Sequence, residues 1–418
     1  MPSNRVLIIG YVWPEPNSSA AGTHMMEFIH LFLERGWQVH FASAATETEH
    51  MVNLPEMGVS VKQLEINDSG FDQYISELQP DIVMFDRFFI EEQFGWRVEK
   101  HYPNALRLLD TEDLHSLRNA RHAAYKQNRD VSRADLMSEM AQREIASIYR
   151  SDLSLMISEA EVALLEKEFN VPSMLLQHCP FMLDVRGLNS DNLPGFEQRQ
   201  HFVSIGNFRH APNWDAVLYL KQIIWPLIRK QLPSAELHIY GAYPPPKATA
   251  LHNAKEGFLV KGWAPDAFEV LRQGKVNLAP LRFGAGIKGK LADGMLCGIP
   301  SVTTSVGAEA MTAGLPWGGD TTDDPQEFAN AAVQLYQSAE YWQKAQQQGI
   351  SIAQKLFDKK SIGDALVDRI EVVKDNLQEH RLNNFTGAML RHHNHRSTQF
   401  MGQWIEVKNR LAEIENMP

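Results

Sequence analysis

The start of the chain follows a strand–loop–helix–strand pattern that constrains the fold more than any other feature. Val6–Gly10 is a short run rich in β-branched residues, and Trp37–Ala42 is a second strand-like run. Between them, apolar residues recur at helical spacing over residues 25–33, and Arg35 and Gly36 supply the basic turn and glycine with which helices commonly end. A β-α-β unit places its two strands side by side, so the sequence predicts a parallel sheet covered by helices.

The same alternation continues along the chain and divides it into two units. Strand-like and helix-like segments alternate up to residue 184, lose their periodicity over residues 185–199, and then resume. At 418 residues the chain is also too long for one ordinary core. We therefore predict an α/β protein with Rossmann-like domains at 1–184 and 200–380, a linker at 185–199 and a helical tail at 381–418. Because ligands bind at the carboxyl ends of such strands, the two domains are expected to face a cleft.

Three helices are predicted from local patterns alone. One long helix is expected over residues 132–150, and another over Lys247–Lys255. A third is expected over Ser158–Phe169, where Ser158 followed by Glu161 has the spacing of a capping box.

Charge and cysteine content exclude several classes of protein. The formal net charge is −11, whereas a general nucleic-acid binder carries a basic surface, so no nucleic-acid partner is expected. The two cysteines, Cys179 and Cys297, give neither a disulfide framework nor zinc-ligand spacing. No apolar run reaches the roughly 20 residues that span a bilayer, and the N-terminal run is too short for a secretory signal. These features predict a cytoplasmic protein.

The segment 118–133 departs from the acidic average. Against a single acid, Asp130, it carries five basic residues: Arg118, Arg121, Lys126, Arg129 and Arg133. Such a patch suits an anionic acceptor or a peripheral contact with the inner face of a membrane. The alternative is an ordinary solvated helix face.

Residues 280–311 carry the clearest chemical signal. A strand leads into a loop containing Gly284 and Gly286, and a helix is expected to begin near Lys290. Glycine lets a backbone approach an anion closely, and a helix N-terminus favours negative charge. Lys288 and Lys290 add cations suited to a diphosphate. The loop differs from a P-loop, because neither lysine is followed by serine or threonine, and its alternative is a turn with solvated lysines.

This segment resembles the donor-binding segment of retaining GT-B glycosyltransferases, in particular family 4 (group 1). The likeness rests on the glycine-rich loop up to Lys288, on Asp293 and Met295, and on Gly298–Thr304 followed by Gly307, Ala308 and Glu309. Upstream landmarks of the same domain are matched by Phe202–Asn207, Pro212–Ala216, His238–Gly241 and Val260–Trp263. The resemblance implies a GT-B fold, in which two Rossmann-like domains face a cleft and C-terminal helices cross back to the N-terminal domain.

The resemblance also implies which residues bind the donor. Lys288 would contact the diphosphate, Asp293 the ribose and Trp263 the base, and Arg209 is the expected second cation. The remaining donor-side candidates are Gly206, Asn207, Gly284, Gly286 and Glu309. The sequence departs from the family at two points. The usual Arg-x4-Lys after the first strand is absent, since Arg209 is followed by Asn213. The second departure lies around Lys288. Many members carry two glutamates here, the first of which touches the transferred sugar, and their places are taken by Ala285 and Asp293.

The N-terminal half is expected to bind the acceptor. Gly22 occupies the place of the family's first glycine loop, which approaches the donor phosphate, although an ordinary turn is the alternative. After the strand Ala105–Leu109, Asp110 and His115 are candidates for orienting the acceptor hydroxyl, with an exposed helix cap as the alternative. Together with Lys288 they form the predicted catalytic set. Trp404 and Ile405 would anchor the tail on this domain.

The expected function is transfer of a sugar from a nucleotide-diphosphate sugar to a hydroxyl of a glycan, lipid-linked or protein acceptor. The resemblance implies retention of the anomeric configuration. No metal and no other cofactor are expected, since basic residues and helix dipoles can neutralise the diphosphate. A sugar-nucleotide epimerase and a non-catalytic nucleotide-sugar-binding protein stay open as alternatives. A dehydrogenase is disfavoured because the first loop lacks GxGxxG.

Overall fold

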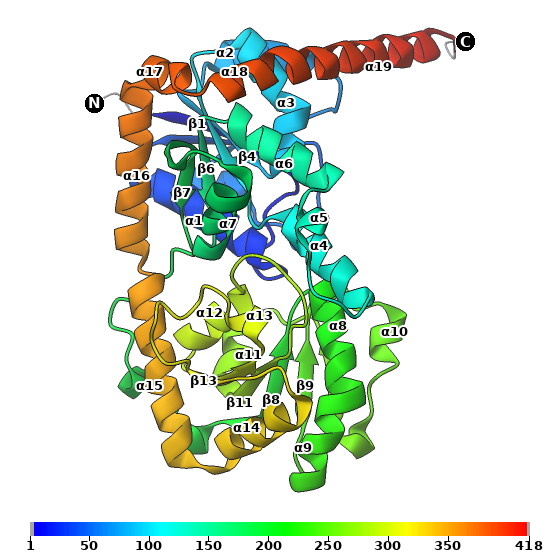
Figure 1. Ribbon diagram of the computed structural model, residues 1–418, viewed down its shortest axis with the longest axis vertical. Coiled ribbons are helices and arrows are strands. Elements are labelled where there is room, and N and C mark those ends of the chain that lie inside the picture. The colour runs from blue at the N-terminus through cyan, green and yellow to red at the C-terminus, as the bar shows by residue number, and fades with distance from the viewer. Residues whose placement is uncertain (1–3, 416–418) are drawn as a thin grey trace.

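The computed structural model describes residues 4–415 and contains two parallel β-sheets, one in each half of the chain (Figure 1). Residues 1–3 and 416–418, the ends of the predicted first domain and tail, lie outside the described residues. In Figure 1 the first domain lies above the second, and the last helices run up one side and across the top. The prediction of two Rossmann-like domains is confirmed.

The first domain is built on a seven-stranded sheet with the order β3-β2-β1-β4-β5-β6-β7. All of its pairings are parallel, and β1, β4 and β5 are buried along most of their length, as expected for strands covered on both faces. The strand order reverses between β1 and β4, which places a ligand crevice at their carboxyl ends. The strands are β1 (Arg5–Gly10), β2 (Gln38–Ser43), β3 (Ser60–Gln63), β4 (Ile82–Asp86), β5 (Leu106–Asp110), β6 (Leu153–Met156) and β7 (Leu176–His178).

Helices cover both faces of this sheet. On one face α1 buries Phe28 and Phe32 in a core with Val6, and on the other α3 buries Phe94 in a core with Leu7. Because neighbouring side chains of a strand point to opposite faces, each strand serves both cores. The helices are α1 (Ala20–Glu34), α2 (Gly70–Leu78), α3 (Phe88–His101), α4 (His115–Lys126), α5 (Arg133–Leu136), α6 (Glu139–Arg150) and α7 (Glu159–Phe169).

The second domain repeats this plan on a six-stranded parallel sheet with the order β10-β9-β8-β11-β12-β13. Its strands are β8 (Gln200–Ile205), β9 (Leu237–Tyr240), β10 (Phe258–Gly262), β11 (Gly274–Ala279), β12 (Ser301–Thr303) and β13 (Gly319–Thr321). Its helices are α8 (Ala211–Tyr219), α9 (Trp225–Gln231), α10 (Pro246–Thr249), α11 (Ala267–Gln273), α12 (Gly289–Leu296), α13 (Ser305–Ala308), α14 (Pro325–Gln337) and α15 (Ala339–Leu356). The strand order reverses between β8 and β11, so this domain also has its ligand crevice at the carboxyl ends of the strands.

The three local helix predictions are wrong in part. The helix expected over 132–150 is two helices, because the Ser138 hydroxyl accepts the N–H of Ala141 and starts a new helix. The helix expected over Lys247–Lys255 shortens to the single turn α10. Ser158 precedes α7 as expected, but its hydroxyl makes no capping hydrogen bond. Helices α3 and α4 and strand β13 come in addition to the predicted elements.

The C-terminal helices cross from the second domain back to the first, as expected. Leu183 marks the crossing point: its N–H donates to Phe357 O at 2.7 Å and its carbonyl accepts the Lys359 N–H at 2.9 Å. The next helix, α16 (Lys359–Asp375), buries Leu366 and Ile370 in the core that contains α1. The chain therefore returns to the first domain earlier than the boundary predicted at residue 380.

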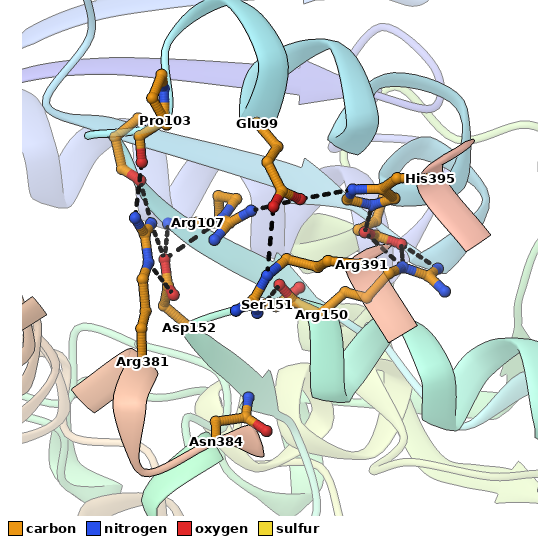
Figure 2. A network of polar contacts seen from close by, with 12 residues as sticks. Glu99, Pro103, Arg107, Arg150, Ser151, Asp152, Arg381, Asn384, Arg391 and His395 are labelled. Carbon is orange, nitrogen blue, oxygen red and sulfur yellow. Dashed lines mark hydrogen bonds and ion pairs between the residues drawn. The ribbon is translucent and has the colours of Figure 1, made fainter. Parts of the chain in front are cut away.

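The end of the tail docks through ion pairs, and of the two residues predicted to anchor it Ile405 is half-buried whereas Trp404 is exposed (Figure 2). Arg381 donates to both carboxylate oxygens of Asp152, at 2.8 and 2.7 Å, and His395 Nδ1 lies 2.6 Å from Glu99. Trp404 itself is 60% exposed. The tail helices are α17 (Leu377–Leu382), α18 (Phe385–Leu390) and α19 (Arg396–Glu415). Within residues 4–415, no helix combines the length and apolar content that a bilayer-spanning helix needs.

Candidate active site

The carboxyl ends of both sheets face a cavity of about 700 Å³ between the two domains. The first domain contributes the loop after β1 and the turns after β4 and β5, and the second contributes the turns after β8 and β9 and the loop before α12. This volume lies in the range of sites for small molecules. The predicted site residues that line the cavity are His115, Gly206, Asn207, Arg209, Trp263, Gly284, Lys288 and Asp293.

Two lysines stand at the N-terminus of α12, on the second-domain wall of the cavity. Lys288 Nζ donates to the carbonyl oxygens of Ala285 and Gly286, at 3.2 and 2.5 Å, and Lys290 Nζ donates to Asn213 Oδ1 at 2.8 Å. Burial lowers the pKa of Lys288 to about 8, and burial together with the charge of Lys288 lowers the pKa of Lys290 to about 7. An anion bound at this helix N-terminus would relieve both the desolvation and the repulsion of the two cations.

Asp293 follows on α12, about one turn beyond Lys290, and lines the same cavity. Burial and the charge of Glu27 raise its pKa to about 7. Its carboxyl group is therefore available in either protonation state near neutral pH. The contact with a ribose stays a prediction.

The loop before α12 is held in place by the first domain. Glu161 Oε1 accepts the N–H of Gly286 at 2.8 Å and the N–H of Leu114 at 3.1 Å. Gly286 has φ +62°, and a Cβ added there would lie 2.9 Å from Cβ of Asp113, so a side chain does not fit. Burial raises the pKa of Glu161 to about 8. Glu161, expected to cap its own helix, therefore joins the two domains. Gly286, predicted to bind the donor, lies at this close contact between the domains and does not line the cavity.

The turn after β8 lies beside Lys290. A Cβ added at Gly206 would lie 2.6 Å from Lys290 Nζ, so glycine leaves room for that lysine. Asn207 Nδ2 donates to Ser18 O of the first domain at 3.2 Å. The guanidinium carbon of Arg209 lies 3.6 Å from the centre of the Tyr243 ring, so this cation is held against an aromatic face at the cavity wall.

Trp263 lies at the junction of the two domains. Its Nε1 donates to Asn17 O at 3.2 Å, and its ring stacks on His50 with centroids 4.5 Å apart and planes at 11°. Both partners belong to the first domain, so the tryptophan links the domains as well as lining the cavity. Its predicted contact with a nucleobase stays a prediction.

On the first-domain wall, Glu112 lines the cavity and the predicted residue Asp110 does not. Asp110 is 1% exposed and accepts the Glu112 N–H at 3.2 Å from behind the turn. Burial and the charge of Glu112 raise the pKa of Asp110 well above its usual range, which favours the neutral acid. Glu112 has φ +60°, a costly conformation for a residue with a side chain and one that clusters at functional sites.

A buried histidine completes this turn. His24 Nδ1 lies 3.8 Å from Glu112 Oε2. Burial acts to lower the pKa of His24, but contacts with Cys179 and Glu112 raise it well above its usual range. Within the described residues, His24, Asp110 and Glu112 bring one ligand atom each within 4.8 Å of one another. This set of oxygen and imidazole donors could hold a divalent cation, and without one it can share a proton.

His115, the other predicted acceptor-side residue, does line the cavity. Its Nε2 lies 3.5 Å from Asp113, which in turn pairs with Arg118. Burial lowers the pKa of His115 to about 4 in spite of Asp113, so the imidazole is neutral near pH 7. A neutral imidazole can accept or donate one hydrogen bond to a substrate hydroxyl.

Two aromatic rings and an arginine extend this wall. The rings of Tyr11 and Phe89 have centroids 6.0 Å apart, and the guanidinium carbon of Arg87 lies 5.2 Å from the centre of the Tyr11 ring. Arg87 has φ +71°, so each of the turns after β4 and β5 holds a non-glycine residue in the left-handed region. An apolar surface with a few fixed polar groups is the usual lining of a ligand site.

Glu309, predicted to bind the donor, pairs instead with the basic segment of α4. Both of its carboxylate oxygens accept from Arg121 at 2.7 Å, and Arg121 also donates to Gly284 O at 2.9 Å. All four arginines of residues 118–133 have acidic partners: Arg118 with Asp113, Arg121 with Glu309, Arg129 with Asp135 and Arg133 with Glu168. Most of the positive charge of this segment is therefore neutralised, and the structure gives no support to the predicted membrane contact.

Gly22 has a different role from the one predicted. It is buried, and a Cβ added there would lie 2.4 Å from the carbonyl oxygen of Glu15. Glycine is therefore required for α1 to pack against the loop that precedes it. Cavity residues that the predicted site omits include Glu112, Arg118, Asn213 and Lys290. Lys290 and Asn213 lie within the motif segments, and this is the signal that points to them. The strained backbone that singles out Glu112 is invisible in the sequence.

Comparisons with known proteins identify the second domain and the overall fold. Residues 199–338 match the family model of glycosyl transferases group 1. No curated protein sequence matches the chain. Sucrose-phosphate synthase from Thermosynechococcus elongatus superposes with a TM-score of 0.67 at 15% identity, covering 88% of this chain and 99% of that one. A glycosyltransferase from Rickettsia africae gives 0.66 at 10% identity, with coverages of 89% and 99%. Anabaena HepE, solved with UDP and glucose, gives 0.65 at 12% identity, with coverages of 88% and 100%.

Likeness at these identities establishes the fold of the chain, and the family match lies in the domain that forms one wall of the cavity. The protein therefore has the GT-B fold, and residues 199–338 of its second domain match the family model of glycosyl transferases group 1.

Proposed function

We propose that the protein transfers a sugar from a nucleotide-diphosphate sugar to an acceptor hydroxyl, with retention of configuration and without a required metal. The observation that carries this proposal is the pair of desolvated lysines, Lys288 and Lys290, at the N-terminus of α12 in the cavity between the domains. Retention rests on the family resemblance. A uridine nucleotide as donor is supported by HepE, which was solved with UDP and glucose.

In the proposed reaction the bond between the anomeric carbon and the diphosphate breaks, and negative charge develops on the departing diphosphate. The two lysines and the α12 N-terminus stabilise that charge. The acceptor hydroxyl gives its proton to the departing phosphate oxygen, so no separate base is required. In this proposal Asp293 holds the ribose.

The first-domain wall suits an acceptor rich in hydroxyl groups. Its charged lining residues balance, with Glu112 and Asp113 against Arg87 and Arg118, so this wall gives no net attraction for an ionic acceptor. A hydroxyl can donate to Glu112 or bond to neutral His115. We therefore assign the orientation of the acceptor hydroxyl to Glu112 and His115, with a glycan or the glycan part of a lipid-linked acceptor as substrate.

The test is nucleotide release from UDP-, GDP-, ADP-, CDP- and dTDP-sugars, with and without simple glycosides as acceptors. The variants are Lys288→Ala and, as a matched control, Lys261→Ala, which removes an exposed lysine that is not part of the cavity lining. We expect release from one donor class, accelerated by a glycoside, lost in Lys288→Ala and kept in Lys261→Ala.

The other outcomes separate the alternatives. Conversion of the donor sugar without transfer to any acceptor would support a sugar-nucleotide epimerase. Nucleotide-sugar binding by calorimetry without turnover would support a non-catalytic binding protein. Neither binding nor release with any of the five nucleotides would overturn the proposal.

A further inference from the structure

The C-terminal helix α19 carries a row of large apolar side chains on its outer face. Five residues along it, Phe400, Trp404, Val407, Leu411 and Ile414, are each between 55% and 66% exposed. Single exposed apolar residues are ordinary on protein surfaces, but a contiguous row of this size marks an interaction surface. The row, called here the α19 seam, lies outside the proposed active site.

The opposite face of α19 is already occupied by the first domain. Figure 2 shows how its base is fixed, with Arg391 and His395 beside Glu99. Further along, Gly402 is buried, and a Cβ there would lie 3.7 Å from the Trp96 ring, while Arg410, on the flank between this face and the seam, donates to Ser69 at 3.1 Å. The helix is therefore held to the body on one side, and in Figure 1 its outer half projects past the rest of the molecule.

The spacing of the seam is that of a coiled coil. Its members follow one another at intervals of four, three, four and three residues, which is the heptad repeat of a and d positions. At 3.6 residues per turn they fall within an arc of about 80°, and Met401, 58% exposed, widens the apolar face only at the first turn of the seam. A helix that lies on a membrane or covers a globular core needs a wider apolar face, whereas a single partner helix covers a narrow stripe.

The residues beside the seam also favour a protein partner. Met401, Lys408 and Glu415 border it on one side, and Gln403 and Arg410 border it on the other. These are the e and g positions of the heptad, where charges of both signs form ion pairs between helices. A helix that binds anionic lipid carries a predominance of lysine and arginine there instead.

We propose that the α19 seam pairs with the α19 seam of a second copy of this chain to form a two-helix coiled coil. A repeating apolar stripe is complementary to itself, which a two-fold dimer requires. Phe400 and Trp404 each leave roughly 100–150 Å² exposed, given the size of aromatic side chains. With the aliphatic members, the dimer buries on the order of 1,000 Å², near the lower end for specific interfaces. The pairing therefore depends on concentration. Because α19 lies at the pole of the first domain farthest from the second, the cavity stays open in the dimer (Figure 1).

The test is the mass of the full chain in solution, measured by sedimentation velocity and light scattering from about 1 to 100 µM. We expect the wild type to approach twice the monomer mass as concentration rises. The double variant Trp404→Glu with Leu411→Glu should stay monomeric, as should the single variant Val407→Glu at the centre of the seam. Asn409→Glu, an exposed change away from the seam, is the matched control and should dimerise like the wild type.

Three results would overturn the proposal. One is a monomeric wild type across the whole range. The second is a wild-type dimer that all the seam variants keep, since its interface would lie elsewhere. The third is a monomer that sediments with phosphatidylcholine–phosphatidylglycerol vesicles and loses this binding in the seam variants, which would make lipid the occupant. Circular dichroism and melting temperature show that each variant is folded, and nucleotide binding should be unchanged in all of them.

Discussion

The two walls of the cavity are built in opposite ways. The second-domain wall takes two lysines and Asp293 from one short segment, 288–293, at the N-terminus of a single helix, and adds Arg209 from the turn after β8. The first-domain wall collects Tyr11, Arg87 and Glu112 from the ends of three separate strands, and its acidic and basic side chains balance. The difference suggests a division of labour. A diphosphate common to every donor can be met by one fixed motif, whereas the acceptor is met by turns that can change independently.

The largest effect is expected from removing a cation from the second-domain wall. Lys290→Ala should lower donor turnover by about 100-fold, because a charge that stabilises the departing diphosphate in a desolvated site is lost. Initial rates of nucleotide release measure this, and Lys261→Ala controls for loss of charge at an exposed position. A loss of donor turnover below about threefold would show that the second-domain wall does not act through paired lysines. The proposed difference between the two walls would then be wrong.

The next effect tests the first-domain wall. Glu112→Gln should lower transfer to an acceptor by about 10- to 100-fold while nucleotide affinity stays unchanged, because an acceptor contact and not a donor contact is altered. Asp110→Asn is the matched comparison. Since burial favours the neutral form of Asp110, an amide should replace it with less than about threefold change. If Asp110→Asn were the more damaging change to transfer, the residue predicted from sequence would be the one that orients the acceptor.

The affinity for a diphosphate is expected to change by about tenfold with pH, through the second-domain wall alone. Burial lowers the pKa of Lys288 to about 8 and of Lys290 to about 7, so both lose their protons as pH rises from 7 to 9. A diphosphate binds the protonated lysines, so its affinity should fall by about tenfold over this range, with proton uptake on binding.

Calorimetry of UDP binding in buffers of different ionisation enthalpy measures both quantities. Lys288→Arg keeps its charge throughout this pH range and should weaken the dependence of affinity on pH. Proton release on binding, or a flat profile in the wild type, would contradict the assignment of the lysines to the diphosphate.

The two walls also differ in how far the sequence predicts them. Most strands follow from the alternation of strand-like and helix-like segments, and the lysines of the second-domain wall lie in one contiguous motif, so both are predictable. Glu161 marks the limit of prediction from local sequence patterns. Its spacing from Ser158 is that of a capping box, yet its carboxylate accepts the N–H groups of Leu114 and Gly286. A local pattern cannot reveal a partner 125 residues away in the chain.

The acceptor side illustrates the same limit. Asp110 and Glu112 stand in one acidic turn, and the sequence cannot tell which of them faces the cavity, because that depends on the left-handed backbone at Glu112. Arg121 likewise belongs to a basic run that suggests a surface patch, until folding brings Glu309 to it. Sequence patterns thus predict elements and contiguous motifs, whereas contacts between the walls require the folded chain.

The smallest effect is expected where the walls meet. Arg121→Ala removes the bidentate pair with Glu309 and the hydrogen bond to Gly284 O, so the loop before α12 loses one of its ties to the first domain. The pair is partly exposed, at 22% and 28%, and such pairs contribute about 0.5–1 kcal/mol. KM for donor and acceptor should therefore both rise by about two- to fivefold, with kcat nearly unchanged. Lys126→Ala, on the same helix, is the control. A rise confined to the donor would mean that Glu309 acts within the second-domain wall alone, as the sequence predicts, and not as a link between the walls.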